Sequence, residues 1–369
     1  MREGGFKMKK LVSFMLVAAM VVATLTGCGS SDNAKSTEAA GESSAAGESS
    51  AAAGTTFKIG GIGPVTGGAA LYGLAVQRGA QIAVDEINAA GGINGTQIEF
   101  NFQDDEADAE KSVNAYNSLK DWGMQMLMGT VTSTPCVSVA AKTAEDNMFQ
   151  LTPSGSSVEC VQSDNAFRVC FSDPDQGKKS AQYIGEHKLA TKVAVIYDSS
   201  DTYSTGIYES FKSEAANQGI EVVAEGAFTA DNKTDFSVPL QQAQAAGAEL
   251  VFLPIYYTEA SLIITQANKM GYAPQFFGCD GLDGLIGVEN FDQSLAEGVM
   301  LLTPFNPSSD DERTQNFVKK YEEKYGETPN QFAADAYDCI YAYKQALEAA
   351  GATPDMDAAT LCDLMIQQF

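Results

Sequence analysis

The chain has 369 residues, and its 48 Asp and Glu residues against 23 Lys and Arg residues give a formal net charge of −25. A surface this acidic repels phosphate, so nucleic acids and anionic lipid head groups are disfavoured as partners. The chain has one histidine, and none of its seven cysteines forms a C-x-x-C pair, so we expect no metal site and no cofactor.

Residues 1–27 have the pattern of an export signal. Four basic residues precede an apolar run over 11–25, which is too short to span a bilayer as a permanent helix. The run ends at Leu25-Thr26-Gly27-Cys28, which resembles the lipobox of bacterial lipoproteins. The resemblance implies cleavage before Cys28 and a lipid anchor of two acyl chains, enough for stable attachment to the outer face of the cell membrane or the periplasmic side. The alternative is an ordinary signal peptide followed by an incidental cysteine.

The segment that follows Cys28 is almost entirely Ser, Ala, Gly and Glu, and it continues to residue 56. Such a composition cannot bury enough apolar surface to offset its ordering entropy. We therefore predict a disordered linker over 28–56, with a reach of about 30 Å. Apolar periodicity begins at Phe57, and the rest of the chain is too long for one ordinary core, which indicates two domains.

Short apolar runs rich in β-formers alternate with amphipathic stretches through both halves of this region. In the first half we predict strands at 57–63, 97–103, 124–129 and 148–152, and helices at 71–90, 107–122 and 134–146. In the second half we predict strands at 193–197, 220–228, 250–254 and 275–279, and helices at 203–218, 237–246 and 259–270. Further helices are predicted at 332–349 and 357–369. This alternation predicts two similar α/β lobes, each with a parallel sheet covered by helices.

The loops that follow the strands are where an open parallel sheet binds its ligand. In the first lobe these loops offer small hydroxyl side chains at the starts of helices. In the second lobe they offer tyrosines and one carboxylate, Asp280.

Several motifs resemble those of type I periplasmic binding proteins, specifically the leucine/isoleucine/valine-binding proteins of ABC importers. They are Gly63-Pro64-Val65-Thr66, Tyr72-Gly73, the stretch over 79–95, and Asp173-Pro174-Asp175-Gln176-Gly177 at the crossing between lobes. The resemblance covers about residues 57–349. It implies two Rossmann-like lobes joined by a hinge, with the ligand in the cleft between them. Lobe 1 would comprise 57–175 with 306–369, and lobe 2 would comprise 176–305.

The same resemblance implies an amino-acid site. Its residues would be Ser133, Ser154 and Ser156 in lobe 1, Tyr203, Tyr256 and Asp280 in lobe 2, and Tyr72 and Phe332 around the ligand side chain. A ligand α-carboxylate needs hydrogen-bond donors and a positive field, which the Ser133 hydroxyl and the free amides of the helix at 134–146 supply. An α-ammonium needs acceptors, and Asp280 supplies a full opposing charge.

Other roles remain open for these residues. Tyr257 is an alternative to Tyr256 as the inward ring, and Ser133 also suits a helix cap. For Asp280 the alternative role is that of a turn residue, and for Phe332 it is packing in the protein core from the start of its helix. The acidic run at 104–108 lacks the spacing of a calcium loop and is better explained as a solvated helix start.

The chain departs from the family pattern at several points. Asp280 replaces the usual Glu, and the positions of a disulfide found in some first lobes hold Glu106 and Thr132. Cys160 and Cys170 flank a short polar segment, so they form either a disulfide or two free thiols. Because Phe369 lies inside a predicted helix, whereas family members continue further, we expect the C-terminal completion of the second lobe to be missing.

The sequence therefore predicts an exported, lipid-anchored monomer that captures a free amino acid by hinge closure and delivers it to an ABC permease. A branched aliphatic side chain (Leu, Ile or Val) is the expected ligand type. The alternative is a ligand-sensing receptor ectodomain for an amino acid or a related amide or aromatic acid. We do not expect an enzyme, because no second catalytic group accompanies Asp280 and no triad can be built around the one histidine, His187.

Overall fold

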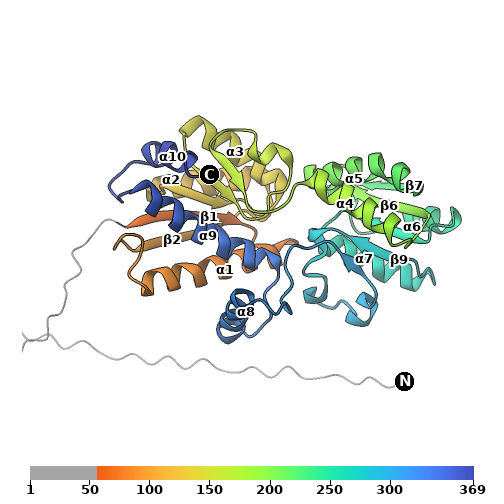
Figure 1. Cartoon of the computed structure of the whole chain (residues 1–369). Coiled ribbons are helices and arrows are strands. Elements are labelled where there is room, and N and C mark those ends of the chain that lie inside the picture. Colours follow the sequence, from red (N-terminus) through yellow and green to blue (C-terminus); the bar gives the residue numbers. More distant parts are fainter. Residues whose placement is uncertain (1–55) are drawn as a thin grey trace, which may run out of the picture. The chain divides into compact units, whose positions relative to one another are not determined.

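The computed structural model describes residues 56–369. This part of the chain forms two α/β lobes, each built on a five-stranded parallel sheet (Figure 1). The strand order is β2-β1-β3-β4-β5 in lobe 1 and β10-β9-β8-β6-β7 in lobe 2. The predicted pair of similar parallel lobes is confirmed. The predicted signal and linker segments, with Cys28, lie outside the described residues.

The central strand of lobe 1 is β3, which is paired in parallel with β1 on one side and β4 on the other, and β1 is in turn paired with β2. Its strands are β1 (Phe57–Gly63), β2 (Ile98–Asp104), β3 (Met126–Gly129), β4 (Gln150–Thr152) and β5 (Ala166–Arg168). One face of the sheet carries α1 (Ala70–Ala89) and α9 (Gln331–Ala350), and the other carries α2 (Ala109–Trp122) and α3 (Ser133–Asp146) (Figure 1).

Lobe 2 repeats the arrangement around β6 and β8. Its strands are β6 (Lys192–Asp198), β7 (Glu221–Phe228), β8 (Leu250–Leu253), β9 (Gln275–Gly278) and β10 (Met300–Leu301). One face carries α4 (Asp173–Glu186) and α5 (Thr202–Ala215), and the other carries α6 (Ser237–Ala245) and α7 (Tyr257–Lys269) (Figure 1).

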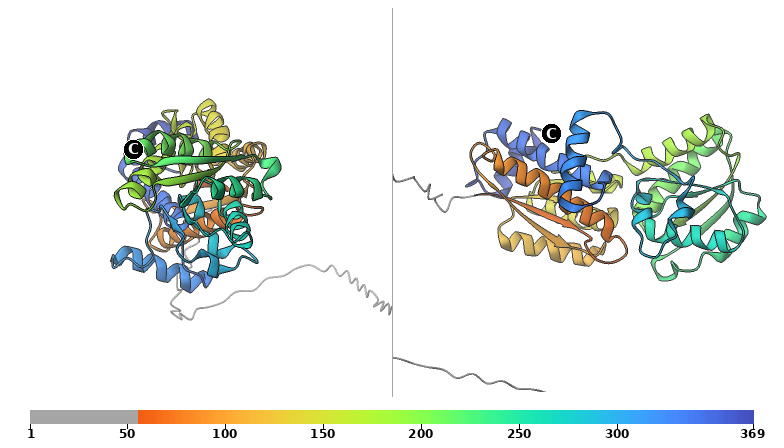
Figure 2. Two further views of the ribbon diagram at one scale, coloured as in Figure 1. Left: turned by 90° about the vertical axis from the view of Figure 1, so that its right-hand side faces the viewer. Right: turned by 90° about the horizontal axis from the view of Figure 1, so that it is seen from below.

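After lobe 2 the chain returns to lobe 1 through α8 (Glu312–Tyr325), α9 and α10 (Ala358–Ile366). Figure 2 shows these blue C-terminal helices lying with the orange N-terminal elements. The helices α1 and α9 approach so closely that a Cβ on Gly79 would lie 2.0 Å from the carbonyl oxygen of Ala333. Because only glycine fits there, the crossing fixes the start of α9 against the middle of α1, and the Phe332 ring then lies 4.5 Å from the ring of Tyr72.

Local signals account for where many helices begin and end. The Asp108 side chain caps α2 by accepting from the amides of Glu110 and Lys111, both at 2.9 Å. The helix ends at Gly123, whose φ of 90° is favourable for glycine. The acidic run at 104–108 thus supplies a helix start, as the sequence indicates, but it is not solvated throughout, because Asp105 is fully buried.

Four elements are absent from the sequence predictions, namely β5, β10, α4 and α8. The segment 173–177, which the resemblance places at the crossing between lobes, forms the start of α4 directly after the connection that follows β5. The Ser172 side chain caps this helix by accepting from the Asp175 amide at 3.2 Å, and Pro174 suits its first turn. The predicted boundary between residues 175 and 176 therefore lies inside α4.

Candidate functional site

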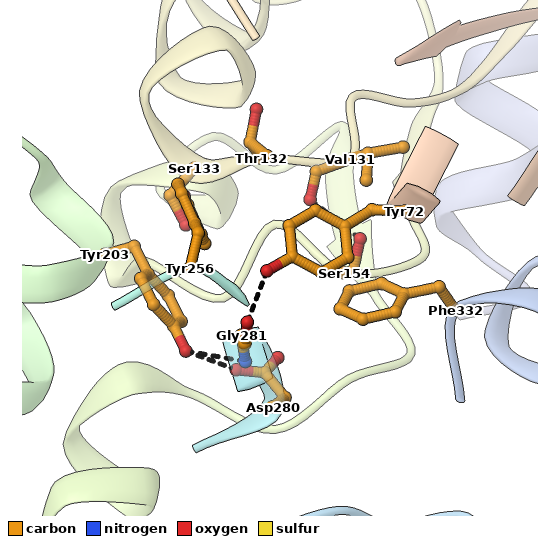
Figure 3. A pocket seen from close by; sticks show the side chains of 10 residues that line it. All are labelled: Tyr72, Val131, Thr132, Ser133, Ser154, Tyr203, Tyr256, Asp280, Gly281 and Phe332. Atoms are coloured by element: carbon orange, nitrogen blue, oxygen red, sulfur yellow. Dashed lines mark hydrogen bonds between the residues drawn. The ribbon is translucent and has the colours of Figure 1, made fainter. Parts of the chain in front are cut away.

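A small cavity of about 10 Å³, about the space of one water molecule, lies between the lobes beside the loops that follow the strands (Figure 3). Seven of the eight predicted site residues line it: Tyr72, Ser133, Ser154, Tyr203, Tyr256, Asp280 and Phe332. They come from the segments that follow β1, β3, β4, β6, β8 and β9, together with the start of α9. The structure thus brings hydroxyl groups of lobe 1 and a carboxylate of lobe 2 to one cavity.

Ser156 is the predicted site residue that does not line this cavity. Its side chain is buried, and its carbonyl oxygen accepts from the Asp173 amide and from the Arg168 guanidinium, each at 3.0 Å. Its hydroxyl oxygen has no hydrogen-bond partner. Ser156 therefore lies behind the cavity wall, at the start of the connection to α4.

The lobe 1 wall is built on the N-terminus of α3. Ser133 is the first residue of this helix, and its hydroxyl oxygen accepts from the Ser157 amide at 3.2 Å, which leaves its proton free to be donated. The cap residue Thr132 makes no side-chain capping bond, and Pro135 has no amide. The helix start therefore presents a hydroxyl donor together with the positive end of the helix dipole, a combination suited to an anion.

Ser154 contributes an acceptor to the same wall. Its hydroxyl donates to the Val131 carbonyl oxygen at 2.7 Å, so its oxygen lone pairs remain available to the cavity. The adjacent Gly155 amide donates to the hydroxyl of Thr152 at 2.7 Å, which holds this turn at the end of β4. Lobe 1 thus offers a donor at Ser133 and an acceptor at Ser154.

The lobe 2 wall is dominated by Asp280, which is only 2% exposed. The Tyr203 hydroxyl donates to its Oδ1 at 2.7 Å and accepts from the Gly281 amide at 2.9 Å (Figure 3). The Asp280 amide donates to the side-chain oxygen of Gln176 at 3.2 Å. The second carboxylate oxygen is left without a donor bond from Tyr203, so Asp280 retains an acceptor for a ligand cation.

Burial raises the pKa of Asp280 to about 6, and the Tyr203 and Gln176 side chains partly offset this rise. Two neighbouring carboxyl groups are also perturbed. Burial, with the charge of Asp280 as an added cause, raises the pKa of Asp173 to about 8, and burial raises that of Asp201 to about 6. With these pKa values Asp280 and Asp201 are mostly ionised at pH 7, whereas Asp173 is mostly protonated. Of the three, Asp280 alone lines the cavity, so its charge is the one that favours a positively charged group there.

Aromatic rings fill the space between the two walls. The Tyr72 ring lies 4.5 Å from that of Phe332 and 5.6 Å from that of Tyr256, measured between centroids. Tyr256 in turn stacks on Tyr203 at 5.0 Å. These rings form an apolar lining, which suits an uncharged side chain.

The structure distinguishes between the two adjacent tyrosines. Tyr256 lines the cavity, whereas Tyr257 does not, and the Tyr257 hydroxyl accepts from the Leu71 amide at 2.9 Å. Of the two tyrosines, Tyr256 is therefore the one whose ring faces the cavity.

The cavity also contains residues that sequence reasoning missed, namely Val131, Thr132 and Gly281. Gly281 has a steric reason to be glycine, because a Cβ there would lie 2.6 Å from the Ile255 carbonyl oxygen and 2.7 Å from the Tyr203 hydroxyl. Its place directly after Asp280 was the available signal.

The cysteine pair considered from the sequence is not joined. All six cysteines among the described residues are free. The thiol of Cys160 is buried and lies 3.8 Å from the Ser133 carbonyl oxygen, on the side of α3, whereas Cys170 follows β5 at the connection between the lobes. Of the two alternatives left open by the sequence, the structure therefore has the two free thiols.

Between residues 56 and 369 no group of three or more His, Cys, Asp or Glu side chains is arranged to hold a metal ion. None of the helices in this range combines the length and apolar character needed to cross a bilayer.

Comparison with known proteins gives a consistent family. A family model described as "Periplasmic binding protein" matches residues 56–365. The Leu/Ile/Val-binding protein homolog 1 of Brucella abortus (strain 2308) is 30% identical over 306 residues, which are 81% of this chain and 80% of that protein.

Solved structures agree with the sequence comparison. The leucine binding protein LivK of Thermotoga maritima is 26% identical with a TM-score of 0.76, and the match covers 85% of this chain and 87% of that one. The branched-chain amino acid transporter substrate binding protein LivJ of Streptococcus pneumoniae, in complex with isoleucine, is 30% identical with a TM-score of 0.75, covering 84% and 87%.

Proposed function

The chain belongs to the periplasmic binding protein family, and from that premise we propose that it captures leucine, isoleucine or valine outside the cytoplasm for an ABC importer. The printed names of relatives support this ligand class: one is a Leu/Ile/Val-binding protein homolog, one a leucine binding protein, and one a transporter protein solved with isoleucine. Its function is binding and delivery, with no chemical change to the ligand.

The observation that carries the proposal is the pairing of opposite polar groups across one apolar cavity. Ser133 and the start of α3 present donors and a positive field, which suit an α-carboxylate. Asp280 presents a buried negative charge, which suits an α-ammonium, and the Ser154 oxygen adds an acceptor. A free amino acid carries both of these charged groups on one carbon atom.

The ligand side chain would then lie among the rings of Tyr72, Tyr256 and Phe332. These rings offer an apolar surface and no buried charge, which favours an aliphatic side chain over a charged one. Tyr203 contributes mainly through Asp280, because its hydroxyl is already occupied by the Asp280 carboxylate and the Gly281 amide. Ser156, behind the wall, would act by supporting the turn that carries Ser154.

Capture follows from the division of the site between two lobes. A ligand held by Ser133 of lobe 1 and Asp280 of lobe 2 makes both sets of contacts only when the cleft is closed. It therefore binds the closed form more tightly and shifts the population toward it. Because α4 belongs as a whole to lobe 2, we take lobe 1 as residues 57–172 with 306–369 and lobe 2 as residues 173–305, with the connections between them as the hinge.

The proposed location rests on the N-terminal sequence, outside the described residues. An export signal over 1–27 and the lipobox-like Leu25-Thr26-Gly27-Cys28 support a monomer anchored through lipid at Cys28, with the segment to residue 56 as its tether. Such a tether would keep the binding protein close to its permease. Intact-mass measurement of the membrane-extracted protein tests this, because acylation at Cys28 adds the mass of the lipid and a Cys28→Ser variant cannot carry it.

The ligand is tested by thermal unfolding and titration calorimetry of the protein with each free amino acid. We expect stabilisation by leucine, isoleucine and valine, amounting to about 2.7 kcal/mol at a hundred times the Kd. Two matched controls each lack one charged group, 3-methylbutylamine the carboxylate and 4-methylpentanoate the ammonium, and both should bind far more weakly than leucine. No response to any free amino acid would rule the proposal out.

A further inference from the structure

Two tyrosines exchange hydrogen bonds between the lobes beside the cavity. The hydroxyl of Tyr72, on α1 of lobe 1, donates to the Gly281 carbonyl oxygen (Figure 3). The same hydroxyl accepts from the Tyr257 amide at 3.2 Å. The hydroxyl of Tyr257, on α7 of lobe 2, accepts from the Leu71 amide at 2.9 Å. Each tyrosine therefore satisfies backbone groups of the opposite lobe.

These bonds compensate for a local deficiency in both helices. Neither α1 nor α7 has a side-chain cap, since the cap residues Ala69 and Tyr256 make no such bond. The amides of Leu71 and Tyr257 lie in the first turns, where a helix leaves its amides without an internal partner. In the closed cleft each helix start is capped by the tyrosine of the other lobe, and opening the cleft would return these amides to water.

Two further contacts extend the same interface. The Thr258 hydroxyl donates to the Gly68 carbonyl oxygen at 2.6 Å. The Leu71 side chain packs where lobe 2 has glycines, because a Cβ on Gly284 would lie 3.7 Å and one on Gly287 3.2 Å from the Leu71 Cδ1 atom. Side-chain packing and hydrogen bonds thus occur together at this contact between the lobes, as is typical of a specific interface.

We propose that these contacts form a clasp that stabilises the closed cleft through bonds that do not involve the ligand. Tyr257 and Thr258 would then contribute to the affinity for the ligand without touching the ligand. The clasp consists of Gly68, Leu71 and Tyr72 in lobe 1 and Tyr257, Thr258 and Gly281 in lobe 2. Tyr257 and Thr258 do not line the cavity. The inference rests on the proposed function, because it concerns closure around a bound amino acid.

A clasp residue and a pocket residue differ in a measurable way. Loss of a clasp bond lowers the closure equilibrium by the same factor whichever ligand is enclosed, so the Kd for every ligand rises equally. Loss of a pocket contact changes the ratio of Kd values between ligands. Because the clasp forms after the ligand has entered, the change should appear in the dissociation rate.

The experiment compares Tyr257→Phe and Thr258→Val with a matched control, Tyr272→Phe. Each test variant loses one hydroxyl of the clasp. The Tyr272 hydroxyl donates to the Ala248 carbonyl oxygen at 3.0 Å within lobe 2, so the control loses a comparable bond away from the cleft. Kd values and dissociation rates are measured for leucine, isoleucine and valine, together with the melting temperature of each variant.

We expect Tyr257→Phe and Thr258→Val each to raise all three Kd values by a common factor of about 2 to 10, the usual net worth of one neutral hydrogen bond. Tyr272→Phe should lower the melting temperature and leave the Kd values unchanged. Kd values in both test variants equal to those of the wild type would overturn the clasp alone, as would a change confined to one ligand. A wild-type protein that binds no amino acid would overturn the proposed function, and the clasp's role in affinity with it.

Discussion

Replacing Asp280 with Asn separates the role of its charge from that of its shape. Asn keeps the size of the side chain and an oxygen that accepts from the Tyr203 hydroxyl, but it removes the negative charge proposed to hold the ligand ammonium. We expect the substitution to weaken ligand binding and, at the same time, to raise the stability of the ligand-free protein.

The loss of binding follows from the burial of Asp280, which is 2% exposed. Removing one partner of a buried charge pair costs about 3 kcal/mol or more, because the other charge is left unpaired. At about 1.4 kcal/mol for each factor of ten, the Kd should rise by roughly 150-fold or more.

The effect on stability has the opposite sign. The pKa of Asp280 is raised by burial from 3.8 to about 6, so the folded protein holds this proton more tightly than the unfolded chain does. The associated stability is present below pH 4 and is lost as the pH rises through 6. At pH 7 the charge therefore costs the ligand-free protein up to about 3 kcal/mol, taking 1.36 kcal/mol for each pKa unit. The Asp280→Asn variant lacks this charge, so its ligand-free form should be more stable than the wild type at pH 7 and should melt at a higher temperature.

Titration calorimetry and differential scanning calorimetry at pH 7 measure both effects. Asp283→Asn is a matched control, because Asp283 is a neighbouring carboxylate with a raised pKa that accepts from the Gln331 amide at 3.2 Å and does not line the cavity. It should leave the Kd nearly unchanged. A Kd for Asp280→Asn within about threefold of the wild-type value would refute the assignment of Asp280 as the ammonium partner.

Three further predictions concern the same cavity. Ser133→Ala removes a donor to the ligand carboxylate and should raise the Kd about 10-fold or more by calorimetry, with the preference among aliphatic ligands retained; an unchanged Kd would count against it. The Kd should rise as the pH falls below 6, by at most about tenfold per pH unit, because protonation of Asp280 removes the charge that binds the ammonium; a flat profile from pH 7 to 5 would contradict this. Phe332→Ala should lower the free energy of unfolding by about 3 kcal/mol in denaturant titration. It should also bring the Kd values for leucine and valine closer together.

Much of the fold is encoded in local patterns that a single sequence reveals. The predicted strand at Phe57–Gly63 has the observed bounds, since its run is interrupted by only one charged residue, Lys58, and ends at a turn. Elements with weak patterns were missed for identifiable reasons. β5 and β10 are only three and two residues long. α8 is polar on most of its surface and buries only Phe317, Val318 and Tyr321, so its apolar stripe is narrow.

The candidate site was accessible from the sequence to the extent that it follows from strand ends. Residues such as Ser133 and Asp280 lie directly after strands, where the topology of a parallel sheet brings them to one edge. What the sequence does not reveal is the direction of a side chain within a turn. Tyr256 and Tyr257 are adjacent, and which ring faces the cavity depends on α7 starting at Tyr257, whereas the predicted start was residue 259.

Contacts between the lobes are likewise absent from any local pattern. The position of Tyr72 after a glycine-rich loop predicts a pocket residue. Its bonds to Tyr257 and Gly281 depend on how closely two distant segments approach. The same reason explains Ser156, whose position behind the wall is set by its contacts with Arg168 and Asp173.

The most direct test of the central claim is a crystal structure of the protein grown with isoleucine. The account predicts one isoleucine between the lobes, its carboxylate within hydrogen-bond distance of the Ser133 hydroxyl and the amides at the start of α3, and its ammonium against the Asp280 carboxylate. An isoleucine bound in the reversed orientation, or at a site away from these two residues, would contradict it.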